Sequence, residues 1–203
     1  MDRGLTSPYP STLRFVFACI ALGALSSVIL AVLEVSVDGF HPWLYGSTLW
    51  VLLGLLGGSR GNYGQACITT ALSLLAQVFT YYLVQQVYPS SLTHLVFWSA
   101  IAVLMSPIAA AIAMNLLQRT GRQVSVAFGA LIGVVGKGIY TAGIVDLFSL
   151  FSVVVVLAVL VWLLRNRPLT PAGIPWLVVG VGAGVLIAWA VPVEPKYMDL
   201  FTQ

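Results

Sequence analysis

Long apolar runs separated by short polar segments organise this chain from residue 15 to residue 191. Most of the runs approach the roughly 20 residues that an α-helix needs to cross a bilayer. The pattern predicts an all-α, polytopic transmembrane helix bundle with seven spans. Six spans is the alternative count, because only Gly143 and Asp146 divide the fifth run from the sixth. The predicted spans are Phe15–Leu33, Trp43–Gly58, Ala66–Val87, Leu95–Leu117, Val124–Val145, Leu147–Leu164 and Ile174–Val191.

Little chain is left outside these runs, so there is no room for a separate soluble domain. Residues 1–14 are predicted to form a short cytoplasmic tail, residues 15–192 a single transmembrane bundle, and residues 193–203 a short external tail. Hydrophobic residues make up 60% of the 203 residues and charged residues only 7%, against roughly 25% charged in soluble domains. We therefore expect a multi-pass protein of the cell (inner) membrane, surrounded by the lipid bilayer.

The arginines predict which way the bundle faces. With seven spans, every arginine falls on one side of the membrane, whereas five acidic residues and Lys196 fall on the other. The positive-inside rule then places the N-terminus in the cytoplasm and the C-terminus outside. The basic residues are dispersed between apolar runs, so no cationic face assembles and nucleic acid is not an expected partner. The arginines are Arg3, Arg14, Arg60, Arg119, Arg122, Arg165 and Arg167, and the acidic residues on the opposite side are Glu34, Asp38, Asp146, Glu194 and Asp199.

Small residues at a spacing of four recur in three of the predicted spans. Lipid offers no hydrophobic drive for helix association, so such stripes mark places where two helix backbones approach closely. One interpretation is ordinary packing within the bundle, and the other is docking to a separate membrane subunit. The stripes are Cys19, Gly23, Ser27 and Ala31 in the first span, Gly129 and Gly133 in the fifth, and Gly180 and Gly184 in the last.

Lys137 is the one basic residue within a long uncharged run, Val124–Val145. Holding an ammonium in hydrocarbon costs about 2.5–3.5 kcal/mol on insertion scales, so such residues usually face protein, a cavity or a ligand. At about 100° per residue, Gly129 and Gly133 lie near the same helix face as Lys137. The lysine is therefore predicted to point toward protein and away from lipid.

A polar stripe on the third predicted span offers Lys137 a neighbour at similar depth. Gln77 and Tyr81 lie on this stripe, and Gln77 is about as far along its span as Lys137 is along the fifth. Glu34, at the outer end of the first span, is the best acidic candidate to approach the lysine. We therefore predict a ligand-binding set of Lys137, Gln77, Tyr81 and Glu34. The alternative is structural, with Lys137 snorkelling beside a hydrogen bond to Gln77.

No catalytic constellation occurs, so neither enzymatic activity nor a cofactor is expected. Walker, Gly-x-Ser-x-Gly and His-Glu-x-x-His motifs are all missing from the sequence. His41 and His94 are the two histidines, and even with Glu34 and Asp38 they lack the ligand spacing of a metal site. Pro107, in the middle of the fourth predicted span, is expected to kink that helix.

The first 90 residues or so resemble the substrate-binding S components of energy-coupling-factor transporters. The resemblance is carried by the stretch Phe40-His41-Pro42-Trp43-Leu44-Tyr45-Gly46, a short span, Arg60, and a third span that opens near Gln65. The general plan also resembles small, uncharacterised bacterial inner-membrane proteins. The S-component resemblance implies an embedded bundle, usually of six spans, that binds a vitamin from outside. It also implies docking through small residues of the first helix to a separate energising module.

These observations favour a non-enzymatic integral membrane protein that binds or transports a small solute. ATPase power, if the protein uses it, would come from partner subunits. The alternative function is a structural or assembly accessory subunit of a larger membrane protein complex.

Overall fold

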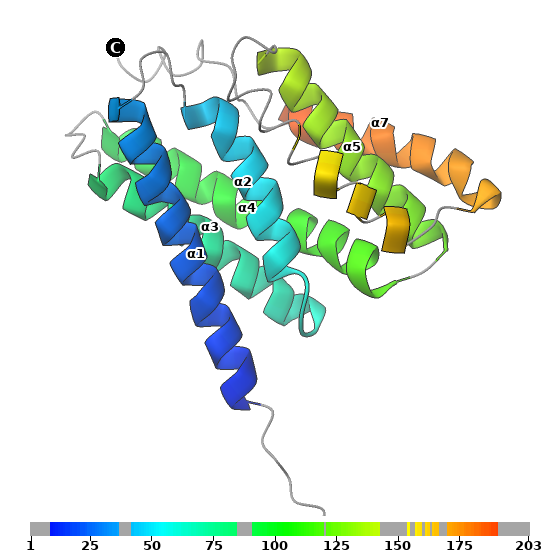
Figure 1. Ribbon diagram of the computed structural model, residues 1–203, viewed down its shortest axis with the longest axis horizontal. Coiled ribbons are helices and arrows are strands. Elements are labelled where there is room, and N and C mark those ends of the chain that lie inside the picture. The colour runs from blue at the N-terminus through cyan, green and yellow to red at the C-terminus, as the bar shows by residue number, and fades with distance from the viewer. Residues whose placement is uncertain are drawn as a thin grey trace, which may run out of the picture.

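The computed structural model describes residues 9–36, 42–84, 91–119, 121–142, 154, 157–159, 161–162, 164–166 and 170–190. The side chains of some helix-end residues, Glu34 among them, are outside this set. Every regular element in the described ranges is a helix (Figure 1), which confirms the all-α prediction. The helices are α1 (Tyr9–Ser36), α2 (Pro42–Gly57), α3 (Tyr63–Val84), α4 (Ser91–Gln118), α5 (Arg122–Ala142), the 3₁₀ turn η1 (Pro171–Gly173) and α7 (Ile174–Ala190), with a short apolar helix at Leu157–Asn166.

Four helices in the described ranges are long and apolar enough to cross a membrane. They cover Thr12–Leu33, Tyr63–Val84, His94–Gln118 and Pro171–Ala190. α2 has 16 residues, which gives it a length of about 24 Å against roughly 30 Å of hydrocarbon. Most of the sixth predicted span falls outside the described residues.

The N-terminal helix is longer than its apolar run. α1 begins at Tyr9, so residues 9–14 of the predicted tail are helical. An apolar run marks the part of a helix that lies in lipid, and a helix can continue past that part into water. Pro10 is compatible with this start, because a proline in the first helical turn has no intrahelical N–H bond to lose.

α3 begins at a reciprocal cap. The Gln65 N–H donates to Asn62 Oδ1 at 2.9 Å, and the Asn62 N–H donates to Gln65 Oε1 at 3.2 Å. This exchange satisfies two of the amide donors that a helix start leaves unpaired. The turn before it passes through Gly61, whose φ of 84° suits glycine. The cap fixes the point at which α2 ends and the chain reverses into α3.

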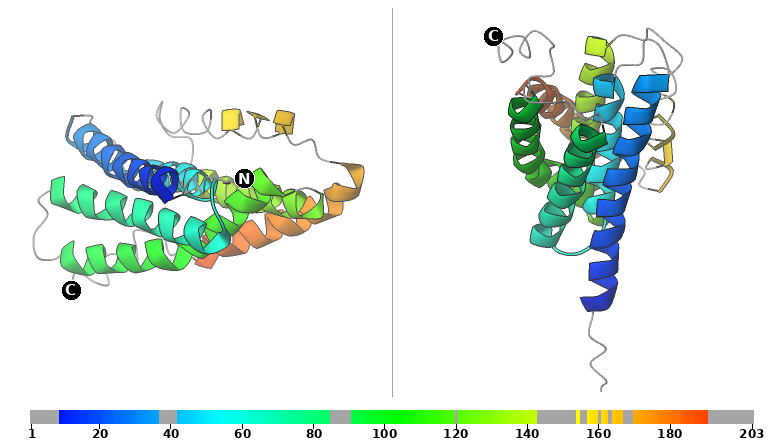
Figure 2. Two further views of the ribbon diagram at one scale, coloured as in Figure 1. Left: turned by 90° about the horizontal axis from the view of Figure 1, so that it is seen from below. Right: turned by 90° about the vertical axis from the view of Figure 1, so that its left-hand side faces the viewer.

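α3 lies between α1 and α4 on one side of the molecule, and α5 packs against α7 on the other (Figures 1 and 2). α2 contacts α1, α3, α4 and α5, so it joins the two sides together with α4. The junction is an apolar cluster built around Leu116, Phe128 and Leu131, with Val51 and Leu55 of α2 packed against it.

One end of the bundle gathers the arginine-bearing connections, and we call it the basic end. The Arg60 guanidinium lies 5.0 Å from the centroid of the Phe15 ring, which places the α2–α3 turn beside the start of α1. Gln118 Nε2 donates to the Ser59 carbonyl at 3.5 Å, which places the end of α4 beside the same turn. Arg122, at the start of α5, lies 5.5 Å from the ring of Trp176 in α7. We call the opposite end of the bundle the far end.

The small-residue stripe of α1 packs on α3. Cys19, Ser27 and Ala31 are almost completely buried, and a Cβ on Gly23 would collide with the Ser73 carbonyl. Ser73 Oγ donates to the Cys19 carbonyl at 2.8 Å, and Ser27 Oγ donates to the Gln77 carbonyl. Later residues of α1 meet later residues of α3, so the two helices run in the same direction.

The glycines of α5 and α7 pack against one another. A Cβ on Gly133 would lie 2.8 Å from the Val185 nitrogen and 3.0 Å from the Gly184 Cα, and a Cβ on Gly129 would lie 2.9 Å from the Gly180 Cα. Backbones therefore touch at two successive turns, as in a small-xxx-small helix pair. The order of these contacts shows that α5 and α7 also run in the same direction.

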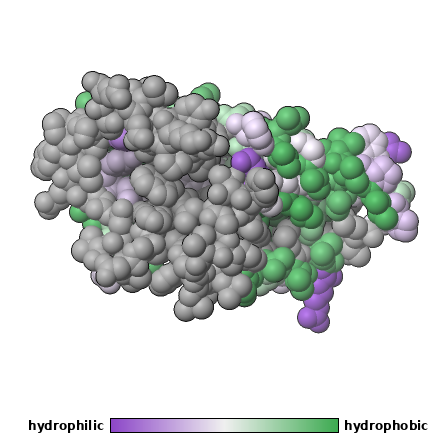
Figure 3. Space-filling model, turned by 90° about the horizontal axis from the view of Figure 1, so that it is seen from above, coloured by the Kyte–Doolittle hydropathy of each residue, from purple (hydrophilic) through white to green (hydrophobic). Residues whose placement is uncertain are grey.

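The surface of the bundle is rich in large apolar side chains. In Figure 3, green hydrophobic residues cover most of the coloured surface. At most 33% of each candidate span is buried inside the molecule, so the rest of each span faces outward. Exposed side chains include Phe17, Leu25 and Ile29 of α1, and Val178 and Leu186 of α7. An outward face of this composition suits lipid rather than water.

Candidate functional site

Helices α2, α3 and α4 meet closely toward the basic end. A Cβ on Gly54 would lie 3.0 Å from Ala109 Cβ, and a Cβ on Gly57 would lie 3.0 Å from Thr70 Cα. A Cβ on Gly58 would likewise collide with Ala113 Cβ. Because glycine and alanine face one another here, the three backbones approach as near as sterics allow.

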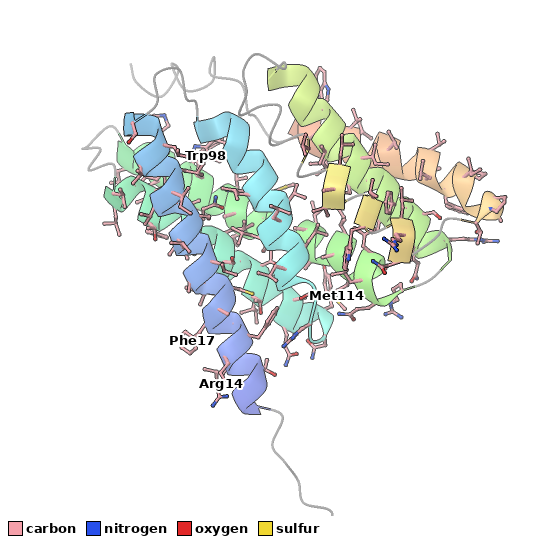
Figure 4. All side chains as sticks on the ribbon, viewed as in Figure 1. Arg14, Phe17, Trp98 and Met114 are labelled. Carbon is pink, nitrogen blue, oxygen red and sulfur yellow. The ribbon has the colours of Figure 1, made fainter. Side chains whose placement is uncertain are left out.

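Larger side chains occupy the same three helices toward the far end. Trp50 of α2 and Trp98 of α4 meet edge to face, with ring centroids 6.1 Å apart. Phe97 adds a second such contact to Trp98 at 5.5 Å. Figure 4 shows Trp98 near the far end of the bundle, whereas Arg14 and Met114 lie toward the basic end. The three-helix unit is thus narrow at the basic end and wider at the far end.

Two polar side chains with buried oxygen atoms lie at a similar depth on α3 and α4. Leu74 of α3 and Ala102 of α4 belong to one buried cluster with Leu53, and α3 and α4 run in opposite directions. Three residues from this level toward the far end, the helices carry Gln77 and Ser99 respectively. Gln77 is 3% exposed, and its Oε1 atom has no hydrogen-bond partner among the described residues. Ser99 Oγ is likewise buried without a partner.

His94 adds a third polar atom on the same side of the bundle. Its Nε2 atom is buried and has no hydrogen-bond partner in the part of the chain that the structure describes. His94 precedes Trp98 by one helical turn and therefore shares its face of α4. An unpaired buried polar group costs about 1–3 kcal/mol in proteins and more in hydrocarbon, where water cannot compensate. Three such atoms in the wider half of one helix unit therefore call for a functional explanation.

The proline of α4 is compensated locally. Pro107 lacks the N–H that would bond to the Val103 carbonyl, and Ser106 Oγ donates to that carbonyl at 2.8 Å. The Pro107 carbonyl accepts a hydrogen bond from Tyr63 OH at 3.1 Å. α4 consequently continues through the proline to Gln118, and its two polar atoms at His94 and Ser99 stay on one continuous helix.

Lys137 lies on the other side of the molecule, against α7. Its Nζ atom is 5.4 Å from the centroid of the Trp189 ring, within the range of a cation–π contact. The lysine is half-buried, while the Trp189 side chain is 73% exposed. Lys137 therefore contacts α7 through an indole ring that is itself largely exposed.

The structure thus divides the predicted ligand-binding set. Gln77 and Tyr81 lie on α3, which packs between α1 and α4, whereas Lys137 belongs to the α5–α7 pair. The expected approach of Lys137 to Gln77 is therefore not observed, because equal depth along two helices does not make the helices neighbours. The Glu34 side chain lies outside the described residues.

Sequence reasoning missed three contributors to this site: Ser99, His94 and Trp50. The sequence did show a polar residue, Ser99, beside Trp98 in an apolar run, and an aromatic residue, Trp50, in the apolar helix α2. What the sequence lacked was the register between α3 and α4, which brings Ser99 to the level of Gln77. Comparison with family models, curated proteins and solved structures finds no match to this chain.

Proposed function

We propose that this chain is a multi-pass protein of the cell (inner) membrane that binds or transports a small solute, with partner subunits supplying any energy that transport requires. The observation that carries the proposal is the pair Gln77 Oε1 and Ser99 Oγ, which lie at a similar depth on α3 and α4 and are buried without a hydrogen-bond partner among the described residues. A solute with polar groups would satisfy these atoms, which lipid cannot do.

The shape of the three-helix unit supports a site that opens toward the far end. Gly54, Gly57 and Gly58 allow α2 to close against α3 and α4 near the basic end. The tryptophans Trp50 and Trp98 occupy the wider half. With the arginines in the cytoplasm, the far end faces outward, so the solute would enter from outside.

Seven spans, with the N-terminus in the cytoplasm, form part of the same proposal. Two helices that run in the same direction across a membrane need an odd number of crossings between them. α1 and α3 are parallel, which supports a crossing by the short α2. α5 and α7 are parallel as well, which supports a return crossing within residues 143–170, the part of the chain that contains Leu157–Asn166.

Small molecules released from the purified protein test the binding function. The wild type and three variants would be purified in mild detergent and denatured, and the released compounds identified by mass spectrometry. Gln77→Leu and Ser99→Ala should lose most of a compound that the wild type carries. Thr70→Val is the matched control, because Thr70 Oγ1 is also buried without a partner but lies at the narrow end against Gly57.

The expected pattern is retention in the wild type and Thr70→Val with loss in the other two variants. Identical release from all four proteins would contradict the proposed site. If the wild type releases no compound but co-purifies with other membrane proteins, the accessory-subunit function is favoured instead. Removing an unpaired polar atom should not lower stability, so thermal unfolding checks that a loss of binding is not a loss of fold.

A further inference from the structure

We infer that the basic end binds anionic phospholipids, one at each of the parallel pairs α1–α3 and α5–α7, through an arginine that is held over an aromatic ring. The inference concerns the outer surface of the bundle and is independent of the proposed solute.

The two parallel pairs carry the same arrangement of side chains. In the first pair, Arg60 precedes α3, and its guanidinium carbon lies 5.0 Å from the centroid of the Phe15 ring in α1. In the second pair, Arg122 begins α5, and its guanidinium carbon lies 5.5 Å from the centroid of the Trp176 ring in α7. Each pair thus holds one cation over a ring of the partner helix, near the beginning of both helices.

The positive charge of both arginines is available to an anion. Both side chains are exposed, and an aromatic ring attracts a guanidinium without carrying a net charge that would neutralise it. The side chains that the structure describes include no aspartate or glutamate, so no carboxylate from this part of the chain pairs with Arg60 or Arg122. A guanidinium donates paired N–H groups to phosphate and stacks on aromatic rings as well.

Apolar surface continues from each ring toward the far end. Val179 lies about one turn beyond Trp176 on the same face of α7 and is exposed. Leu22 lies about two turns beyond Phe15 on the same face of α1 and is also exposed. Tryptophan is itself favoured at the level of lipid headgroups.

A phospholipid combines the two features that this surface requires. Its phosphate would meet the arginine, and its acyl chains would cover the apolar side chains beyond the ring. Basic residues next to membrane spans attract anionic lipids in this way. An acidic protein surface would match the arginines alone, so the observations favour the lipid.

Lipid titrations of the purified protein test the inference. The wild type, in an uncharged detergent, would be titrated with phosphatidylglycerol, with phosphatidylcholine of the same acyl chains and with inorganic phosphate, and the bound molecules would be counted by native mass spectrometry. Phosphatidylglycerol should bind at two sites and more tightly than phosphatidylcholine, and inorganic phosphate should not bind. Arg60→Gln and Arg122→Gln should each weaken one of the two binding steps about fivefold.

Arg14→Gln is the matched control for the charge. Arg14 is also exposed at the basic end (Figure 4), but no aromatic ring lies against it among the described residues. Its replacement removes the same charge and should leave phosphatidylglycerol binding unchanged. Trp176→Leu keeps the charge but removes the ring beneath Arg122, so it should weaken the same binding step as Arg122→Gln.

Several results would overturn the inference. Equal binding of the two lipids, binding of inorganic phosphate, or a loss in Arg14→Gln as large as that in Arg122→Gln would each do so. If only one of the two arginine variants weakens binding, the inference is wrong for the other helix pair. An acidic protein that co-purifies with the wild type and is released by both variants, while the two lipids bind alike, would show that the partner is a protein.

A salt titration of the wild type checks the charge without any substitution. Exposed charges are screened by salt, so the preference for phosphatidylglycerol over phosphatidylcholine should shrink as sodium chloride is raised. A preference that stays constant would contradict binding through exposed arginines. Thermal unfolding without lipid checks that each variant is folded.

Discussion

Buried hydroxyl groups in this bundle fall into two sets. Ser27, Ser73 and Ser106 each donate to a backbone carbonyl, either of a neighbouring helix or of their own. Such bonds cost the bundle nothing, because the hydroxyl is satisfied within the protein. Ser99 Oγ and the side-chain oxygen of Gln77 have no such partner. The contrast within one small bundle separates side chains that hold helices together from side chains whose polar atoms have no hydrogen-bond partner in the described part of the chain.

Lys137 and Trp189 should stabilise one another measurably. A cation over an indole ring contributes about 0.5–1 kcal/mol when exposed and about 2 kcal/mol when desolvated. A double-mutant cycle with Lys137→Met and Trp189→Leu should therefore give a coupling free energy of unfolding within this range. The control cycle pairs Lys137→Met with Trp176→Leu at the basic end, where the two effects should simply add. Additivity in both cycles would show that the contact contributes nothing.

At the scale of helices, the sequence was a good guide to which faces pack and a poor guide to which helices pair. The stripes through Gly23, Gly133 and Gly184 all lie at close helix contacts, and they do so because small side chains are what close contacts require. Both contacts, α1 with α3 and α5 with α7, are within the chain. The α1 stripe, which the S-component resemblance associates with docking to another subunit, is buried on α3.

The pairing itself depends on information that a single helix does not carry. Gln77 and Lys137 lie at similar depths, yet one is buried beside α1 and the other contacts α7. Depth follows from counting residues along a span. Which helices are neighbours follows from how several faces fit together, and the glycine face of α5 fits the glycines of α7. The candidate site was therefore half predicted, through Gln77 and Tyr81, and half missed.

The α5–α7 contact should be sensitive to a single methyl group. Gly133→Ala would place a Cβ 2.8 Å from the Val185 nitrogen and should lower the free energy of unfolding by about 1–3 kcal/mol. Gly136→Ala is the matched control on the same helix, because a Cβ there meets nothing within 4 Å. It should be neutral or stabilising by about 0.5–1 kcal/mol, since alanine favours helices. Equal effects, measured by thermal or denaturant unfolding, would mean that the two helices do not touch here.

At the scale of the whole molecule, connections that are far apart in the sequence meet at the basic end. The start of α1, the α2–α3 turn, the end of α4 and the start of α5 and α7 are linked by the contacts of Arg60, Gln118 and Arg122. Dispersed along the sequence, these residues gather at one end because each lies at a helix terminus on the same side of the bundle.

Labelling of single cysteines should report this topology in intact cells. After replacement of Cys19 and Cys67 by alanine, Arg60→Cys and Thr120→Cys should be shielded from an impermeant thiol reagent, whereas Leu92→Cys should react. Asp146→Cys should react and Arg167→Cys should not, because the parallel α5–α7 pair requires a crossing between them. Reaction of both from the same side would remove that crossing and with it the seven-span count.

Parallel pairing also gives the molecule an order of assembly. Synthesis proceeds from the N-terminus, so the polar stripe of α3 enters a membrane in which α1 already offers the Cys19 carbonyl and the Gly23 face. In the α5–α7 pair, the helix that carries the charged side chain is made before its partner. Lys137 and the glycines of α5 enter first, and their partner α7 is made after them. Until α7 arrives, the Gly129 and Gly133 face of α5 lacks the helix that covers it, which is a surface that membrane quality control could recognise. The arrival of α7 would thus remove that surface.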